Sequence, residues 1–167
     1  NEHMKSRILN IEADKILKEL IDHDVLLVPG FQGINSNNEI TTLGRGGSDT
    51  SAVAVASTFN AECIIYTDVD GVYTTDPNLV KNAKKIPQIS YEEMLELASQ
   101  GAKVLQTRSV ELAMRKKTKL SVRSSMKPKI SGTVVTEENS KLENNTVSGI
   151  AYSKDEAKIT LSRVLDK

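Results

Sequence analysis

The sequence predicts an α/β protein, a three-layer sandwich in which helices cover a mostly parallel sheet. Residues 11–21 and 90–98 carry apolar side chains at helical spacing. Short, uninterrupted apolar runs occur at residues 25–28 and 63–66. Such runs are typical of strands that are covered on both faces, as in a parallel sheet. Because these helices and strands alternate with short connections, we expect an α/β architecture.

The first elements are an amphipathic helix and a strand. The apolar positions of the helix are Ile11, Ile16, Leu17, Leu20 and Ile21. Residues 25–28 (VLLV) then predict a strand that ends at Pro29 and Gly30. A polar loop follows as far as Thr41, and residues 48–50 (SDT) indicate the start of the next helix.

The middle of the chain continues the alternation. Residues 63–66 (CIIY) predict the next strand. Asp76 precedes Pro77, which places a capping carboxylate before a proline at the first helical position and predicts a short helix. Ser90 and Glu93 have the spacing of a capping box, so a longer helix is expected to begin there.

A further helix and strand follow at residues 107–117 and 120–123. Three basic residues fall in the last turn of that helix, where they complement the negative end of its dipole. A solvated helix end is therefore favoured over a nucleic-acid contact. The composition then changes: residues 126–146 are typical of a linker interrupted only at 133–135 (TVV), and residues 150–152 and 159–161 resemble strand pieces.

The overall composition limits the possible functions. Of the 167 residues, 38% are hydrophobic, enough to form a core. Lysine plus arginine and aspartate plus glutamate balance at 22 each, which predicts no broad attraction to nucleic acid or anionic membranes. No apolar run approaches the roughly 20 residues of a membrane span. The single cysteine, Cys63, lies in an apolar run, which predicts a buried thiol and fits a reducing cytoplasm.

The segment most able to carry chemistry is the glycine-rich stretch from Gly44 to Asp49. Glycine allows the backbone to approach a ligand closely, and the free N–H groups of the following helix attract anions. Arg45 adds a fork that can hold a carboxylate or phosphate. A tight strand-to-helix loop with a solvent-facing arginine is the alternative. Asp49 would repel an anionic ligand, so it suits a role in holding cationic side chains, and the chain lacks the phosphate-binding G-x-x-x-x-G-K-[ST] pattern.

Residues 41–49 (TTLGRGGSD) resemble the signature of aspartate kinases, within the amino acid kinase family. The resemblance extends to residues 28–33 (VPGFQG), 67–77 (TDVDGVYTTDP) and 101–105 (GAKVL). Order and spacing agree over about the first 125 residues. Several independent motifs in register make the resemblance specific.

The resemblance implies that the β-carboxylate of L-aspartate is phosphorylated by ATP with Mg²⁺, in a cytoplasmic enzyme that forms a homo-oligomer. It assigns Asp49 and Lys103 to catalysis, with Asp49 orienting lysines and Lys103 close to the transferring phosphoryl group. The implied aspartate-binding residues are Arg45, Gly46, Gly47 and Ser48. The implied nucleotide-binding residues are Thr67, Asp68, Tyr73, Asn78, Lys103 and Val104. No metal ligand is assigned to the protein, since the nucleotide phosphates hold most of the Mg²⁺.

The sequence also departs from the family pattern. Asn78 stands where many relatives carry a nucleotide-contacting arginine, and Gln106 where histidine is common. The Lys-Phe-Gly-Gly segment that begins these kinases does not occur. We therefore expect the nucleotide-side part of an incomplete kinase domain in residues 1–125, a linker at 126–146 and a truncated start of an ACT regulatory domain at 147–167, inactive alone. Another amino acid kinase, or a non-catalytic nucleotide- or amino-acid-binding module, is the alternative.

Overall fold

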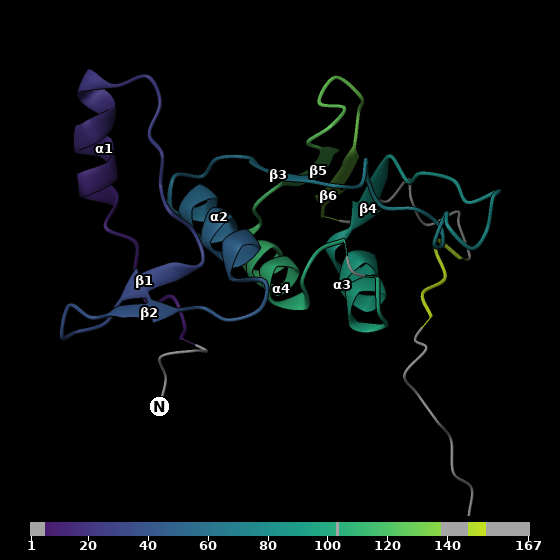
Figure 1. Ribbon diagram of the computed structural model, residues 1–167, viewed down its shortest axis with the longest axis horizontal. Coiled ribbons are helices and arrows are strands. Elements are labelled where there is room, and N and C mark those ends of the chain that lie inside the picture. Colours follow the sequence, from purple (N-terminus) through teal and green to yellow (C-terminus); the bar gives the residue numbers. More distant parts are fainter. Residues whose placement is uncertain (1–5, 103, 138–146, 153–167) are drawn as a thin grey trace, which may run out of the picture.

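The computed structural model describes residues 6–102, 104–137 and 147–152 (Figure 1). Four helices and two sheets occur within these residues. The helices are α1 (Ala13–Asp22), α2 (Gly47–Thr58), α3 (Tyr91–Ser99) and α4 (Thr107–Lys116). The strands are β1 (Gln32–Ile34), β2 (Ile40–Thr42), β3 (Cys63–Thr67), β4 (Gln88–Ser90), β5 (Leu120–Ser124) and β6 (Thr133–Thr136). None of these helices has both the length and the apolar character that a membrane span requires.

The main sheet has the strand order β3-β5-β6-β4. Strands β3 and β5 run parallel, with Cys63 opposite Leu120 and Thr67 opposite Ser124. Strands β4 and β6 are also parallel, whereas β5 and β6, which follow each other in the chain, are antiparallel. The predicted α/β class with a mainly parallel sheet is confirmed.

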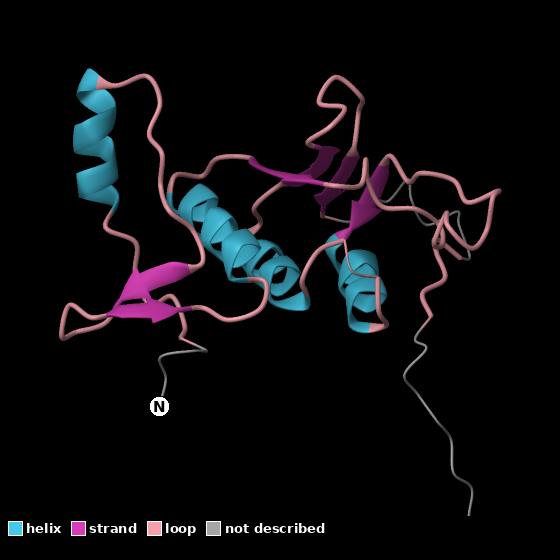
Figure 2. Ribbon diagram, viewed as in Figure 1, coloured by secondary structure: helices cyan, strands magenta, loops and turns pink. Residues whose placement is uncertain are grey.

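Helices α2, α4 and α3 lie next to one another along one side of this sheet (Figure 2). Apolar side chains from all three helices meet those of β5 and β6 in one core. Its fully buried members include Val53, Met94, Val110, Val122 and Val135. The alternating burial along β3 and the near-complete burial of β5 show that β5 lies nearer the centre of the core. Burial of these side chains is the main force that holds the helices on the sheet.

The predicted start of α3 is confirmed in detail. The Ser90 hydroxyl accepts the backbone N–H of Glu93 at 3.2 Å, and the Glu93 carboxylate accepts the backbone N–H of Ser90 at 3.1 Å. This reciprocal capping satisfies donors that the first helical turn leaves without partners. The predicted helix at 107–117 is confirmed as α4, and Lys117 ends it in the left-handed conformation with φ 55°.

The first forty residues differ from the expectation. Residues 13–22 do form α1, but Leu17 and Ile21 are 51% and 80% exposed, and Figure 1 shows the helix standing apart from the sheet. Residues 25–28 form no strand, contrary to the prediction, and Leu27 is 93% exposed. An apolar run becomes a strand only when a neighbouring strand accepts its backbone hydrogen bonds, and no strand of the described chain pairs with residues 25–28.

The short elements predicted near the cavity and the C-terminal end differ in part from the structure. Residues 77–79 form a turn rather than a helix, although the Asp76 carboxylate does accept the backbone N–H of Asn78 at 2.8 Å. One capped turn is too short to offset the cost of helix nucleation. The apolar run at residues 133–135, which interrupts the expected linker at 126–146, belongs to β6, whereas residues 150–152 form no strand. The expected strand piece at 159–161 lies outside the described residues.

Candidate functional site

The glycine-rich loop joins β2 to α2 and owes its shape to its glycines. Gly44 and Gly46 have φ of 75° and 71°, a left-handed conformation that glycine adopts without strain. A Cβ atom on Gly46 would lie 2.5 Å from Cβ of Gln106. The loop therefore packs closely against the start of α4. Arg45 and Ser48 remain exposed, so the loop presents both side chains at the N-terminal end of α2.

Asp49 lies in the first turn of α2 and is half-buried. Burial raises the pKa of its carboxyl above the ordinary value, although the backbone N–H of Gln106, which donates a hydrogen bond to it, acts in the opposite direction. The contact joins the beginnings of α2 and α4. Lys103, which we expect Asp49 to orient, lies outside the described residues, so that pairing stays a prediction.

Cys63 begins β3 and lies close enough to Asp49 to feel its charge. Burial and the negative charge of Asp49 raise the pKa of the thiol to about 11. At pH 8 the thiolate fraction is then roughly a thousandth, against roughly a tenth for a thiol with the ordinary pKa of 9.0.

We expect the Cys63 thiol of the folded protein to react with Ellman's reagent at least about tenfold more slowly than the same chain in guanidinium chloride. Equal rates under the two conditions would contradict the burial of Cys63.

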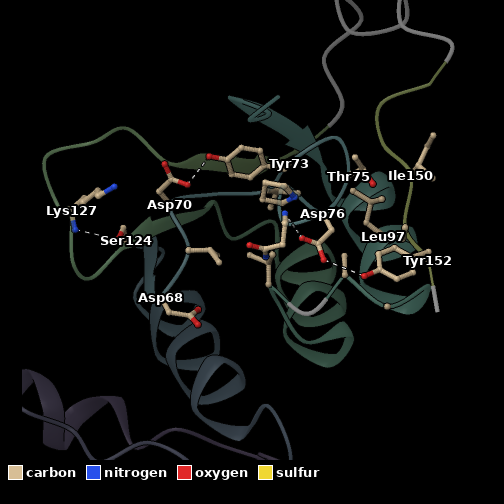
Figure 3. A pocket seen from close by; sticks show the side chains of 18 of the residues that line it. Asp68, Asp70, Tyr73, Thr75, Asp76, Leu97, Ser124, Lys127, Ile150 and Tyr152 are labelled. Atoms are coloured by element: carbon tan, nitrogen blue, oxygen red, sulfur yellow. Dashed lines mark hydrogen bonds between the residues drawn. The ribbon is translucent and has the colours of Figure 1, made fainter. Parts of the chain in front are cut away.

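A cavity of about 930 Å³ opens beside the carboxyl ends of β3 and β5 (Figure 3). In open α/β sheets, ligands bind at this edge of the strands. The loop after β3, the turn at residues 75–78, the end of α3 and the loop after β5 all contribute to its wall. Among its polar lining residues are Asp68, Asp70, Tyr73, Asp76, Asn78 and Lys127.

Hydrogen bonds fix the polar groups of this cavity. The Tyr73 hydroxyl donates to the Asp70 carboxylate at 2.9 Å, and the Lys85 ammonium lies 3.5 Å from the same carboxylate. The Tyr73 bond, followed by the charge of Lys85, holds the pKa of Asp70 below its usual value. Lys85 also donates to the backbone oxygen of Ser131 at 2.7 Å, which ties the loop before β6 to the cavity.

Residues 147–152 pass along another side of the cavity. The backbone N–H of Ile150 donates to the oxygen of Thr74 at 2.7 Å, and the Tyr152 hydroxyl donates to the Asp76 carboxylate at 3.2 Å. Figure 3 shows Tyr152 and Asp76 facing each other, with Leu97 and Ile150 nearby. A segment distant in sequence thus completes the cavity wall.

The structure brings most of the expected nucleotide residues together. Asp68, Tyr73, Asn78 and Val104 line the cavity, and the Thr67 hydroxyl donates to the Asp68 carboxylate at 3.1 Å. The expected aspartate-binding residues, at 45–48, lie instead at the start of α2 and are not part of the cavity lining.

The sequence predicted no ligand-binding role for several cavity residues. Asp70 and Asp76 belong to the motif at residues 67–77, which could have indicated them. Lys127 and Tyr152 lie in segments whose composition gave no functional signal. Their place in the wall depends on the fold alone.

Residues 3–124 match the amino acid kinase family, and the chain belongs to that family. The aspartate kinase of Pseudomonas putida is 50% identical over 165 residues, which are 98% of this chain and 40% of that protein. The chain thus spans about 40% of the length of this relative.

Solved structures agree with the sequence comparison. Aspartokinase III of E. coli, crystallised with aspartate and ADP, matches with a TM-score of 0.70 and 39% identity, over 76% of this chain and 28% of that one. The aspartate kinase of Clostridium acetobutylicum matches with a TM-score of 0.73 and 32% identity, over 83% of this chain and 32% of that one. Both of these similar structures are aspartate kinases.

Proposed function

We propose that this chain is the nucleotide-side part of an aspartate kinase, which transfers the γ-phosphoryl group of ATP to the β-carboxylate of L-aspartate. The observation that carries the proposal is the presence of two separate features. One is the glycine-rich loop at residues 44–49, in which Arg45 is exposed (the Arg45 loop), and the other is a polar cavity at the sheet edge. The E. coli relative that shares this fold was crystallised with both aspartate and ADP. We assign one ligand to each part of the site.

The Arg45 loop is proposed to bind aspartate. A guanidinium group holds a carboxylate through two parallel hydrogen bonds, and Arg45 is exposed for such a contact. Ser48 and the backbone of Gly46 and Gly47 would complete the contacts, because the N-terminal end of a helix favours an anion. Asp49, one residue further on, accepts a hydrogen bond from the backbone N–H of Gln106, which compensates part of its charge.

The cavity is proposed to bind the nucleotide. Asp68 is exposed at its edge and is oriented by Thr67, which suits a hydrogen bond to ribose hydroxyl groups. Tyr73 is fixed by Asp70 and can present its ring to the base, and Asn78 and Val104 lie in the same wall. Lys127 adds a cation to the same lining.

The segment at residues 101–106 links the two parts. Gly101, Ala102 and Val104 line the cavity, whereas Gln106 contacts Gly46 and Asp49 of the loop. Lys103 lies between these residues in the sequence, so we propose that it neutralises charge on the transferring phosphoryl group. The aspartate carboxylate is itself the nucleophile and is ionised at neutral pH. The reaction therefore needs positioning and positive charge rather than a strong base.

The proposed cofactor is ATP with Mg²⁺. The described residues contain no cluster of three His, Cys, Asp or Glu side chains able to hold a metal ion. Asp70 is already bonded to Tyr73 and Lys85. Mg²⁺ keeps several waters and binds mainly through nucleotide phosphates in kinases, so it would enter with ATP.

We place the kinase part of the chain through Thr136 rather than residue 125, because β6 pairs with both β5 and β4. Residues 147–167 are proposed to begin an ACT regulatory domain, of which residues 153–167 lie outside the described structure. Allosteric control within lysine biosynthesis, a cytoplasmic location and homo-oligomer formation are proposed for the complete enzyme. Another E. coli aspartokinase III structure contains lysine and aspartate and is named as its T-state.

The test is ADP formation that requires both ATP and L-aspartate, with the acyl phosphate trapped as a hydroxamate. We expect turnover by the complete enzyme that contains this chain. The 167 residues alone should show none, because they span about 40% of the Pseudomonas relative. Turnover with glutamate or UMP in place of aspartate would indicate another amino acid kinase. Amino-acid binding without nucleotide binding in calorimetry would indicate a non-catalytic module.

A further inference from the structure

We propose that Arg108, in the first turn of α4, is a positioning residue that holds the Arg45 loop in its aspartate-binding conformation. The inference rests on the proposed function of that loop. Arg108 Nη1 donates to the backbone oxygen of Leu43 at 2.8 Å, and Nη2 donates to the backbone oxygen of Ser6 at 2.8 Å. One guanidinium group thus joins α4 to segments that are 65 and 102 residues away in the sequence.

The loop needs such an external support. Leu43 immediately precedes Gly44, and both Gly44 and Gly46 adopt left-handed conformations. Glycine loses more conformational freedom on ordering than any other residue, so a loop rich in glycine is costly to hold in one shape. Leu43 is 3% exposed, and its backbone N–H donates to the oxygen of Phe31 at 2.9 Å. Arg108 therefore fixes the carbonyl of a residue whose N–H and side chain are already held.

Gln106 holds the other end of the same loop. Its side chain packs against Gly46, and its backbone N–H donates to Asp49. Arg45 lies between the carbonyl held by Arg108 and the glycine held by Gln106. Its backbone is fixed from both sides while its side chain stays exposed. Such preorganisation strengthens ligand binding, because the ordering cost is met before the ligand arrives.

A guanidinium group suits this task better than an ammonium group. Its planar fork makes two directed hydrogen bonds at once and keeps its charge at any physiological pH. Arg108 is only partly buried, but both of its bonds go to backbone oxygens. Lysine in its place could bond to one of the oxygens but could not direct two bonds in the same geometry.

The test compares Arg108→Met, Arg108→Lys and Arg115→Met in the complete enzyme. Arg115 lies on the same helix, is exposed and serves as the matched control. We expect Arg108→Met to raise KM for aspartate about tenfold or more, the loss that corresponds to one charge-assisted hydrogen bond. KM for ATP should change less than about twofold, because the cavity lining does not include Arg108. Arg108→Lys should give a smaller rise, and Arg115→Met none.

Hydrogen exchange provides a readout that is independent of turnover. The amides of residues 43–47 should exchange faster in Arg108→Met than in the wild type, with those of α3 unchanged. An active wild-type enzyme whose Arg108→Met variant keeps its aspartate KM, or raises both KM values equally, would overturn the inference. If Arg108→Met does not fold, Arg108→Lys decides by the same criteria. A wild-type enzyme without aspartate-dependent ADP formation would instead contradict the proposed function.

Discussion

Replacing Arg45 with methionine is expected to lower kcat/KM for aspartate about a hundred- to a thousandfold in the complete enzyme. This decrease is expected because the variant loses a paired, charge-assisted contact with a substrate carboxylate. The loss of transition-state stabilisation corresponds to about 3–4 kcal/mol. Because Arg45 is exposed and lies in a loop fixed by other residues, its removal should leave Tm nearly unchanged. The measurement is steady-state kinetics with aspartate varied at saturating ATP.

The matched variant for this prediction is Arg45→Lys. It retains the charge but loses the fork, so it should recover only part of the lost kcat/KM. The KM for ATP should stay close to that of the wild type in both variants, because Arg45 is not among the cavity-lining residues. A decrease of less than about threefold in Arg45→Met would show that this arginine does not bind the substrate.

Replacing Gly132 with alanine is expected to have the largest effect on stability. Gly132 lies just before β6, opposite β5. A Cβ atom there would overlap the carbonyl oxygen of Val122 and would lie 2.7 Å from its carbonyl carbon. The atoms in the way are backbone atoms of a fully buried strand residue, so no side-chain rotation can relieve the overlap. We expect a loss of at least about 3 kcal/mol, or failure to fold.

Gly33→Ala is the control for this substitution. Gly33 lies in the exposed strand β1, and a Cβ atom there would meet nothing within 4 Å. The Tm of Gly33→Ala should stay within a few degrees of the wild-type Tm or rise slightly, because alanine reduces the conformational freedom of the unfolded chain. Thermal unfolding of the two variants measures the difference. Equal Tm values for Gly132→Ala and Gly33→Ala would show that the backbone at Gly132 does not approach Val122 closely.

Local signals were sufficient wherever an element depends on neighbours in the sequence. The Ser90 and Glu93 spacing located the start of α3 because a capping box forms within one turn. The apolar runs at residues 63–66 and 120–123 located β3 and β5. In the site, the glycine-rich segment and the motif at residues 67–77 predicted ligand-binding roles for Arg45, Asp68 and Tyr73 from the sequence.

Other features depended on partners far away in the chain. Residues 25–28 have a strand-like composition but pair with no described strand. Residues 133–136 begin with a short apolar run inside an expected linker, and yet they pair with both β5 and β4. Tyr152 reaches the cavity through tertiary contacts, among them its bond to Asp76, a residue 76 positions earlier. No local pattern encodes such pairings, since strand formation and wall building depend on which surfaces meet.

The sequence by itself determined that this protein carries a glycine-rich loop with an arginine at a helix start, and that it belongs among the α/β proteins. Only the tertiary structure decided how that loop is held. Arg108 reaches Leu43 across 65 residues because the starts of α2 and α4 pack together. Likewise, the cavity exists because parallel strands β3 and β5 end at the same edge of the sheet. Residue types within short segments determine which chemical groups the site contains, whereas long-range packing of the core determines where those groups lie.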